Sequence, residues 1–166
     1  MKHLLILAIL FVSLCAKSQP QKVSAPGNVG DIAFDSMTDR RDFYLCHLEN
    51  IYQYYNFGTT YKGEKYTLRK TLIKKFIYQK EYKKVSGYVV IRFVVNCKGE
   101  TDRFRVSQID QNYNPAEFDA GLVEQLLRLT KELKDWIPGK RDGVPIDSYV
   151  YLNFIIKNGK LVDVGP

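Results

Sequence analysis

The chain contains few of the side chains on which most catalytic and metal sites depend. Its 166 residues include two histidines, three cysteines and one tryptophan. His3 lies in an apolar N-terminal stretch, so His47 is the one imidazole left for the folded part, too few for a histidine-centred triad or a multi-histidine metal site. The stretch GTTYKGEK also lacks the P-loop pattern. The sequence therefore predicts a protein that is not an enzyme and that holds no metal and no cofactor.

An apolar run long enough to cross a membrane is also lacking. The longest run, Leu4 to Ala16, has about 13 residues, against about 20 for a transmembrane helix. It follows a basic start at Lys2, and Ala16 and Ser18 form a small-residue cleavage site. Residues 1–18 are therefore predicted to be a secretory signal peptide that is cleaved after Ser18.

A second interpretation of this segment is lipid attachment at Cys15, because VSLC resembles a lipobox. Leu14 stands where that motif usually has a small residue, which favours the soluble product over the lipid-anchored one. Both interpretations predict an exported protein of the periplasm or cell envelope.

Acidic residues are fewer than basic ones. Loss of Lys2 and Lys17 with the signal lowers the formal net charge from +7 to +5. The remaining basic residues are spread through KGEKYTLRKTLIKKFIYQKEYKK and GKR, as in a solvated helix face. Such a surface would also allow peripheral contact with an anionic membrane, a glycan or an acidic protein. No nucleic-acid-reading motif is present, so we expect no nucleic-acid partner.

Two cysteines, Cys46 and Cys97, remain after the signal is removed. An oxidising compartment permits a disulfide between them, and their even number suits one. Against the pairing, Cys97 is expected at a hairpin tip and Cys46 on a separate helix. The sequence leaves this disulfide open.

Two segments precede the expected core. Residues 19–34 are rich in Gly, Pro and small polar residues and predict a flexible arm. Residues 35–86 predict a helical extension that packs on the domain that follows. Its first helix would begin at Ser36 with a capping-box-like Asp39, and it would stop at Gly58. Its apolar stripe would be formed by Tyr44, Leu48, Ile51 and Tyr55. The tyrosines would also suit a ligand platform, although a packed helix face is the simpler interpretation.

A second helix of this extension is predicted from Thr67 to about Lys80. Its apolar stripe would consist of Leu68, Leu72, Phe76 and Ile77, with basic residues on its other faces. Basic amphipathic helices can lie on membranes, but packing on a sheet is the commoner outcome.

The expected core begins with a β-hairpin at Gly87. In GYVVIRFVVNCKGETDRFRVSQID, apolar residues alternate with polar ones, so one face of each strand is expected to be buried. The inward side chains would be Val89, Ile91, Phe93, Val95, Phe104 and Val106. Gly99 can adopt the positive φ of the turn.

A helix and a last strand complete the predicted core. NPAE supplies a cap at Asn114 and a proline at the first helical position, and leucines then recur at helical spacing up to Leu133. The last predicted strand is Tyr149 to Lys157. Its inward residues would be Val150, Leu152, Phe154 and Ile156.

The segment from Gly87 to Val164 resembles the C-terminal domain of TonB, the bacterial energy transducer. The parallels are the GYVVIRFVVN strand, the NCKGE turn, an acid-led helix and WIPGKRDGVPI before a final strand. The specific part is W-x-P-G-K followed by G-x-P, a structural signature of Trp136, Pro138, Gly139, Lys140, Gly143 and Pro145. The resemblance implies an α+β fold over residues 87–166, a small antiparallel sheet with strand–strand–helix–strand order preceded by one or two additional helices.

TonB-like domains bind an extended segment of an outer-membrane transporter as a strand added beside the last strand of the sheet. For this chain the resemblance implies an open edge from Tyr149 to Ile156, where main-chain hydrogen bonds would supply the affinity. The side chains that would flank the guest strand are Tyr149, Tyr151, Asn153 and Ile155. The predicted function is that of a TonB-like envelope binding protein in TonB-dependent transport, with a protein partner and no small-molecule substrate.

Two features depart from TonB itself. The apolar N-terminal segment is short and is predicted to be cleaved, and six prolines in the whole chain supply no proline-rich spacer. The alternative prediction is therefore a structural or assembly protein of the cell envelope that self-associates through the same edge and has no role in energy transduction.

Overall fold

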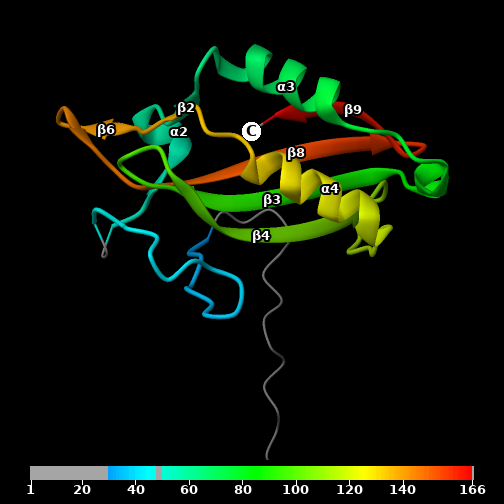
Figure 1. Ribbon diagram of the computed structural model, residues 1–166, viewed down its shortest axis with the longest axis horizontal. Helices are drawn as coiled ribbons and strands as arrows, with labels where there is room; N and C mark the ends of the chain where they lie inside the picture. The colour runs from blue at the N-terminus through cyan, green and yellow to red at the C-terminus, as the bar shows by residue number, and fades with distance from the viewer. Residues whose placement is uncertain (1–29, 48–49, 166) are drawn as a thin grey trace, which may run out of the picture.

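The computed structural model describes residues 30–47 and 50–165, and within them the chain has a mixed α+β fold. A five-stranded sheet forms the centre, and helices α3 (Glu64–Lys75) and α4 (Ala120–Lys131) cover one of its faces (Figure 1). The strands are β1 (Tyr52–Gln53), β3 (Gly87–Val95), β4 (Thr101–Asp110), β8 (Ser148–Lys157) and β9 (Lys160–Gly165). Their neighbour order is β1–β8–β3–β4, and β9 also pairs with β8.

The predicted hairpin is confirmed as β3 and β4. The inward residues of β3 are fully buried against the helices, because apolar side chains at alternate positions share one face. A bulge interrupts the pairing between Arg92 and Val94, and Arg103 opposite it has a φ of 58°. At the turn, Gly99 has a φ of 79°, and a Cβ there would lie 2.5 Å from the Trp136 carbonyl oxygen. A glycine is therefore required at this position.

Helix α4 begins later than predicted. The segment starting at Asn114 instead lies along the end of β4, where the Asp110 N–H donates to the Asn114 carbonyl (2.9 Å). The helix starts after Asp119, whose carboxylate accepts the Leu122 N–H (3.2 Å). Pairing with β4 therefore outweighs the local capping signal. The predicted stripe is confirmed for Leu122, Leu126, Leu129 and Leu133, which are all buried.

Helix α3 forms the second part of the helical layer and is shifted from its predicted bounds. Leu68 and Leu72 are buried as predicted. The helix ends before Phe76, whose backbone is extended, so Ile77 is exposed rather than part of the buried stripe. The Gln125 side chain of α4 accepts a hydrogen bond from the Ile77 N–H (2.6 Å) and donates one to the Ile77 carbonyl (3.0 Å). A short 3₁₀ helix, η2 (Lys80–Lys84), leads into β3.

The predicted helix from Ser36 to Gly58 is wrong for the described residues. Turns occupy its first half, because the carboxylates of Asp35 and Asp39 bind nearby backbone N–H groups at 2.8–2.9 Å. One helical turn remains, α2 (Tyr54–Phe57), and Gly58 ends it with a φ of 75°. The prediction that Gly58 ends a helix is confirmed.

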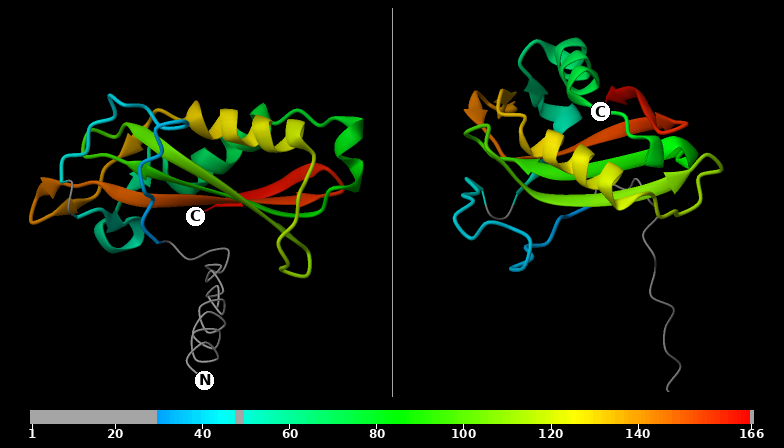
Figure 2. Two further views of the ribbon diagram at one scale, coloured as in Figure 1. Left: turned by 90° about the horizontal axis from the view of Figure 1, so that it is seen from below. Right: turned by 45° about the vertical axis from the view of Figure 1, so that its right-hand side comes forward.

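The segment 30–47 packs against the sheet face opposite the helices. Blue to cyan in Figure 2, it wraps around the β4 edge of the sheet. Ile32 and Leu45 are buried with Val94 and Tyr149 in a second, smaller core. Residues 30–34, predicted to be part of a flexible arm, are therefore packed in part, since Ile32 is only 4% exposed. The predicted signal peptide and most of the predicted arm lie outside the described residues.

Candidate functional site

The strand predicted to bind a partner is β8, and it is not an open edge. It pairs with β3 over its whole length up to Ile156. On its other side it pairs with β1 at Ser148 and Tyr149, and with β9 from Asn153 to Lys157. The prediction of an open last strand from Tyr149 to Ile156 is therefore wrong.

Strand β9 was not predicted, although the sequence contains a signal for it. Asn158 and Gly159 join β8 to β9 with φ values of 49° and 75°. An Asn-Gly pair with two positive φ angles is the common two-residue hairpin turn. Leu161 and Val164 then point to the core and are buried against α3. The predicted last strand therefore turns back on itself and covers part of its own edge.

A short stretch of β8 lies between these two covered parts. At Val150–Leu152 the strand pairs with β3, whereas the β1 pairing ends at Tyr149 and the β9 pairing starts at Asn153. Beside this stretch lies a notch of about 230 Å³ that reaches the core, with Leu68 and Trp136 in its lining. We call it the edge notch. Its remaining lining residues are Tyr54, Thr59, Thr60, Tyr61, Glu64, Lys65, Val150 and Leu152.

The four predicted binding side chains alternate with the inward residues of β8 and so lie on the face opposite the helices. Tyr149 is buried beneath the segment that carries Ile32. Tyr151 meets the ring of Tyr54 edge-on at 5.7 Å. Tyr151 and Asn153 line a cavity of about 290 Å³ on this face, the outer-face cavity, and Ile155 does not. The structure therefore brings together two of the four residues. The cavity is completed by Tyr88, Val90, Arg92, Ile109 and Tyr113.

The other long edge of the sheet, β4, is also protected. The backbone of residues 114–116 bonds to its end, and the Arg40 N–H donates to the Asp102 carboxylate (2.9 Å) at its start. Between them lie the bulge and the side chains of Arg103 and Arg105. Bulges and charged side chains are common devices that prevent strand addition at an edge.

The signature residues shape the corner that leads into β8. Trp136 belongs to β5 (Trp136–Ile137), which pairs with β2 (Thr60–Tyr61). Its ring meets Phe93 and Tyr61 edge-on at 5.3 and 5.4 Å, and it is 8% exposed. The indole Nε1–H is buried without an acceptor among the described residues. Trp136 therefore closes the core beside the end of helix α4.

The rest of the signature forms an exposed β-hairpin. β6 (Lys140–Arg141) pairs with β7 (Val144–Pro145), and both strands are exposed. Gly139 joins it to the core, since its N–H donates to the Thr59 hydroxyl (3.0 Å). Pro145 pairs with Lys140 in this hairpin and does not belong to the large sheet.

A disulfide joins Cys46 to Cys97, with their Cα atoms 6.0 Å apart. The argument against this bond fails because Cys46 lies in a loop rather than on a helix. Asp147 beside it is fully buried, and its carboxylate accepts the N–H groups of His47 and Cys97, both at 2.8 Å. The N-terminal segment is therefore fixed to the β3–β4 turn both covalently and by hydrogen bonds. Nothing in the sequence pattern singled out Asp147.

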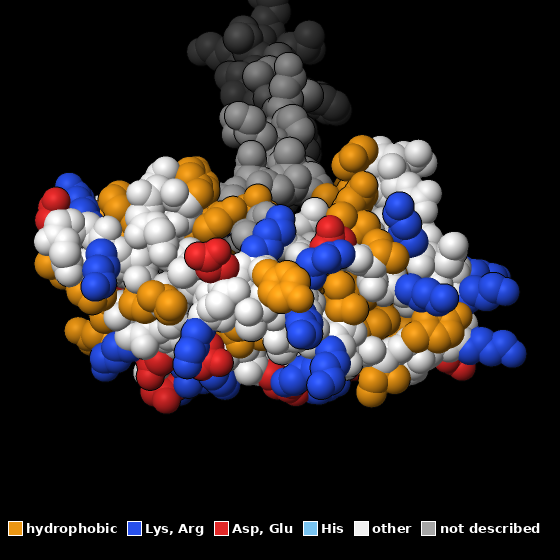
Figure 3. All heavy atoms as spheres, turned by 90° about the horizontal axis from the view of Figure 1, so that it is seen from above, with side chains coloured by type: hydrophobic (Ala, Val, Ile, Leu, Met, Phe, Trp, Pro, Cys, Tyr) orange, Lys and Arg blue, Asp and Glu red, His pale blue; other side chains and the backbone are white. Residues whose placement is uncertain are grey.

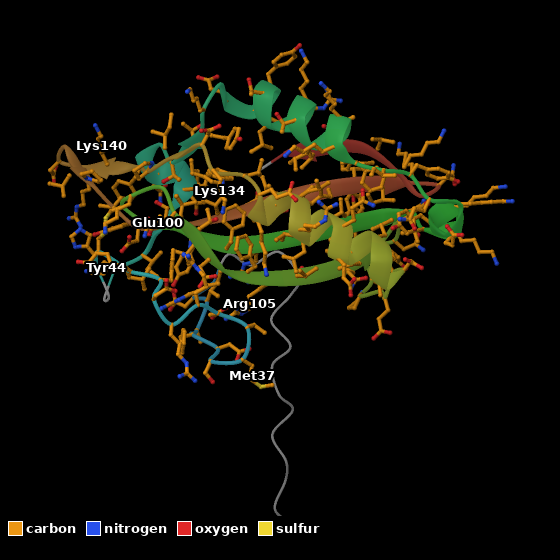
Figure 4. All side chains as sticks on the ribbon, in the orientation of Figure 1. Met37, Tyr44, Glu100, Arg105, Lys134 and Lys140 are labelled. Atoms are coloured by element: carbon orange, nitrogen blue, oxygen red, sulfur yellow. A yellow bond between two sulfur atoms is a disulfide. The ribbon has the colours of Figure 1, made fainter. Side chains whose placement is uncertain are left out.

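Basic side chains are spread over several surfaces. Figure 3, which shows the side that carries α3, has basic side chains interspersed with apolar ones rather than a single patch. A groove of about 510 Å³ lies where the β3–β4 turn meets the end of α4, near Glu100 and Lys134 in Figure 4. Its cations are Arg40, Lys98, Lys131 and Lys134, and its acids are Glu100 and Asp102. This mixture of charges resembles a solvated surface.

Comparison with known proteins finds no matching family model, no similar curated protein and no matching solved structure. Among the described residues no helix is both long and apolar enough to span a membrane.

Proposed function

We propose that this chain is a TonB C-terminal-like binding protein of the cell envelope that pairs with an extended segment of an outer-membrane transporter. The proposal is supported by the sequence signature and by the hairpin–helix–strand arrangement of β3, β4, α4 and β8, in which the three strands pair antiparallel. The observation that carries it is the interval Val150–Leu152 of β8, which among the described strands pairs with β3 alone and borders the edge notch.

The direction of the backbone groups suits this interval for a guest strand. The Tyr52 N–H of β1 donates to the Asp147 carbonyl (3.0 Å). The backbone N–H and C=O of Asp147 therefore point away from β3. Because successive residues of a strand alternate in hydrogen-bonding direction, those of Tyr151 point the same way. A guest would pair there and place one side chain in the edge notch, with Leu68 and Trp136 around it.

A longer guest would have to replace β9. That strand buries Leu161 and Val164, each worth about 1.5–3 kcal/mol. The guest must therefore supply apolar side chains at matching positions to compensate for the loss. This requirement favours a segment with alternating apolar residues over one that is polar throughout.

The test is an NMR titration of the ¹⁵N-labelled chain with synthetic peptides that cover the N-terminal segments of outer-membrane transporters from the same organism. We expect one peptide to perturb the amides of Val150–Leu152 and to show interstrand contacts with them. Tyr151→Pro removes the donor and should abolish binding, whereas Tyr151→Val keeps the donor and should retain it. Chemical shift changes that leave the amides of β8 unaffected would rule out strand pairing at this interval. Equal binding of the peptide by the Tyr151→Pro and Tyr151→Val proteins would also rule it out.

A further inference from the structure

The outer-face cavity contains a cation, Arg92, that has no matching anion among the described residues. Arg92 and Arg105 lie directly opposite each other across β3 and β4, an arrangement that is unfavourable for like charges. The guanidinium of Arg105 binds both carboxylate oxygens of Asp39 at 2.7 Å. Arg92 forms no ion pair among the described residues. One arginine of the pair is therefore neutralised and the other is not.

The surroundings of Arg92 make this imbalance costly. Its guanidinium donates to the Gly30 carbonyl, and its Nε–H is buried with no acceptor in the part of the chain that the structure describes. Burial lowers the pKa of Arg92, because the charged form loses hydration. A partly buried charge without a counter-ion is unfavourable, and an anion in the cavity would recover part of that energy.

A second polar atom of the cavity also lacks a partner. The Oδ1 of Asn153 is buried and accepts no hydrogen bond from residues 30–47 or 50–165. Asn153 lies opposite Val90, next to the row in which Tyr151 lies opposite Arg92. The cavity therefore combines a cationic donor with a neutral acceptor, and it suits a ligand that carries both an anion and a donor group.

The rest of the cavity wall is apolar or aromatic. Tyr88 and Tyr113 stack with their ring centres 5.5 Å apart and nearly parallel, at 13°. Val90 and Ile109 form part of the lining and are mostly buried. At about 290 Å³ the cavity is near the lower end of the range for ligand pockets and matches one amino-acid residue better than an oligomer.

We propose that the outer-face cavity binds the carboxy-terminal residue of a peptide that ends in an apolar side chain. The terminal carboxylate would bind Arg92, the amide N–H of the last residue would donate to Asn153, and the side chain would pack on the stacked tyrosines. A sugar acid fits less well, because the stacked rings, Val90 and Ile109 suit an apolar side chain better than several hydroxyls. The proposal does not depend on strand pairing at β8, since the cavity lies on the sheet face.

Isothermal titration calorimetry with acetyl-Ala-Ala-Leu tests the proposal. We expect saturable binding, and about tenfold or greater loss of affinity when the same peptide ends in an amide, because a hydrogen-bonded charge pair is removed. Chemical shift changes should centre on the amides of Val90, Arg92 and Asn153. Absence of binding at millimolar peptide, or equal binding of the acid, the amide and glucuronate, would overturn it.

Two variants separate the carboxylate contact from general charge effects. Arg92→Gln should lower the affinity at least tenfold, whereas Lys98→Gln removes the same charge far from the cavity and should leave it unchanged. Asn153→Asp changes the side chain little in size but gives Arg92 a built-in carboxylate. It should therefore abolish peptide binding while raising the melting temperature. An Asn153→Asp protein that binds the peptide as tightly as the original would refute the proposal even if Arg92→Gln failed to fold.

Discussion

At the scale of single residues, charge pairing decides what a side chain contributes. Arg105 and Asp39 form a bidentate ion pair in which the carboxylate is almost completely buried. The Arg105 guanidinium lowers the pKa of Asp39 from 3.8 to about 2. Such an aligned pair should stabilise the fold more than the exposed pair of Arg69 with Asp163 does.

The Asp39 pair predicts a defined pH dependence of stability. The pKa of Asp39 is lower in the folded state, so its contribution is complete above about pH 4 and is lost as the pH falls toward about 2. Asp39→Asn should therefore lower the free energy of unfolding by about 2 kcal/mol at pH 7 and by much less at pH 2, measured by urea denaturation. The control Asp163→Asn should cost under about 1 kcal/mol at pH 7. A penalty for Asp39→Asn that is equal at both pH values would mean that packing, rather than charge, is lost.

Burial of the Trp136 ring predicts a second effect on stability. Trp136→Ala removes a buried ring that contacts Phe93 and Tyr61, and it should lower the free energy of unfolding by about 3–5 kcal/mol. Trp136→Phe keeps a ring in the site and leaves no indole N–H unpaired, so it should cost clearly less. Denaturation followed by circular dichroism measures both. Equal losses would show that the ring contacts contribute little.

At the scale of elements, periodic segments and irregular ones differ in what holds them. The leucine stripe of α4, and Leu68 and Leu72 of α3, are buried as their spacing predicts. Segment 30–47, by contrast, has no regular structure and is held by contacts with residues far away in the chain. The disulfide and the Asp147 carboxylate are the clearest of these contacts.

The disulfide predicts a large effect on stability. Its two cysteines are 51 residues apart. Closing a loop of this length lowers the conformational entropy of the unfolded chain, which stabilises the folded state by about 4 kcal/mol. We expect the Cys46→Ala/Cys97→Ala protein to be less stable by that order of magnitude in guanidinium denaturation. Reductant should destabilise the original protein similarly and leave the double variant unaffected. An original protein indifferent to reductant would show that hydrogen bonds alone hold the segment.

At the scale of the whole molecule, neither β8 nor β4 has a long bare edge among the described residues. β9 and β1 cover most of β8, and the bulge, the arginines and residues 114–116 protect β4. An exposed strand edge would promote association between chains. Self-association through β8, the alternative suggested by the sequence, would first require β9 to leave.

Removal of β9 should therefore change the association state. A chain ending at Asn158 loses Leu161 and Val164 and exposes β8, so it should be less stable by about 3–6 kcal/mol and should dimerise in sedimentation velocity runs. The full chain should remain monomeric. Leu161→Ala/Val164→Ala keeps the strand but loses its packing, so it should be destabilised and still monomeric. Dimers of the double variant would point to exposed apolar surface rather than to the strand edge.

The sequence by itself determined the elements whose signal is local. Alternation along Gly87–Val95 and Ser148–Lys157, and the leucine stripe of α4, each identify a buried face, because the period of the backbone fixes which side chains lie together. The Asn158–Gly159 turn carried an equally local signal for β9, so that strand could have been predicted.

Only the tertiary structure decided the rest, because it depends on residues distant in the chain. The disulfide, the burial of Asp147 by groups from two loops, and the coverage of β8 by β1 all require the folded chain. The candidate site follows the same rule. Tyr151 and Asn153 could be assigned to one face from alternation, but Arg92 and the Tyr88–Tyr113 pair join them through strand register, which no local pattern specifies.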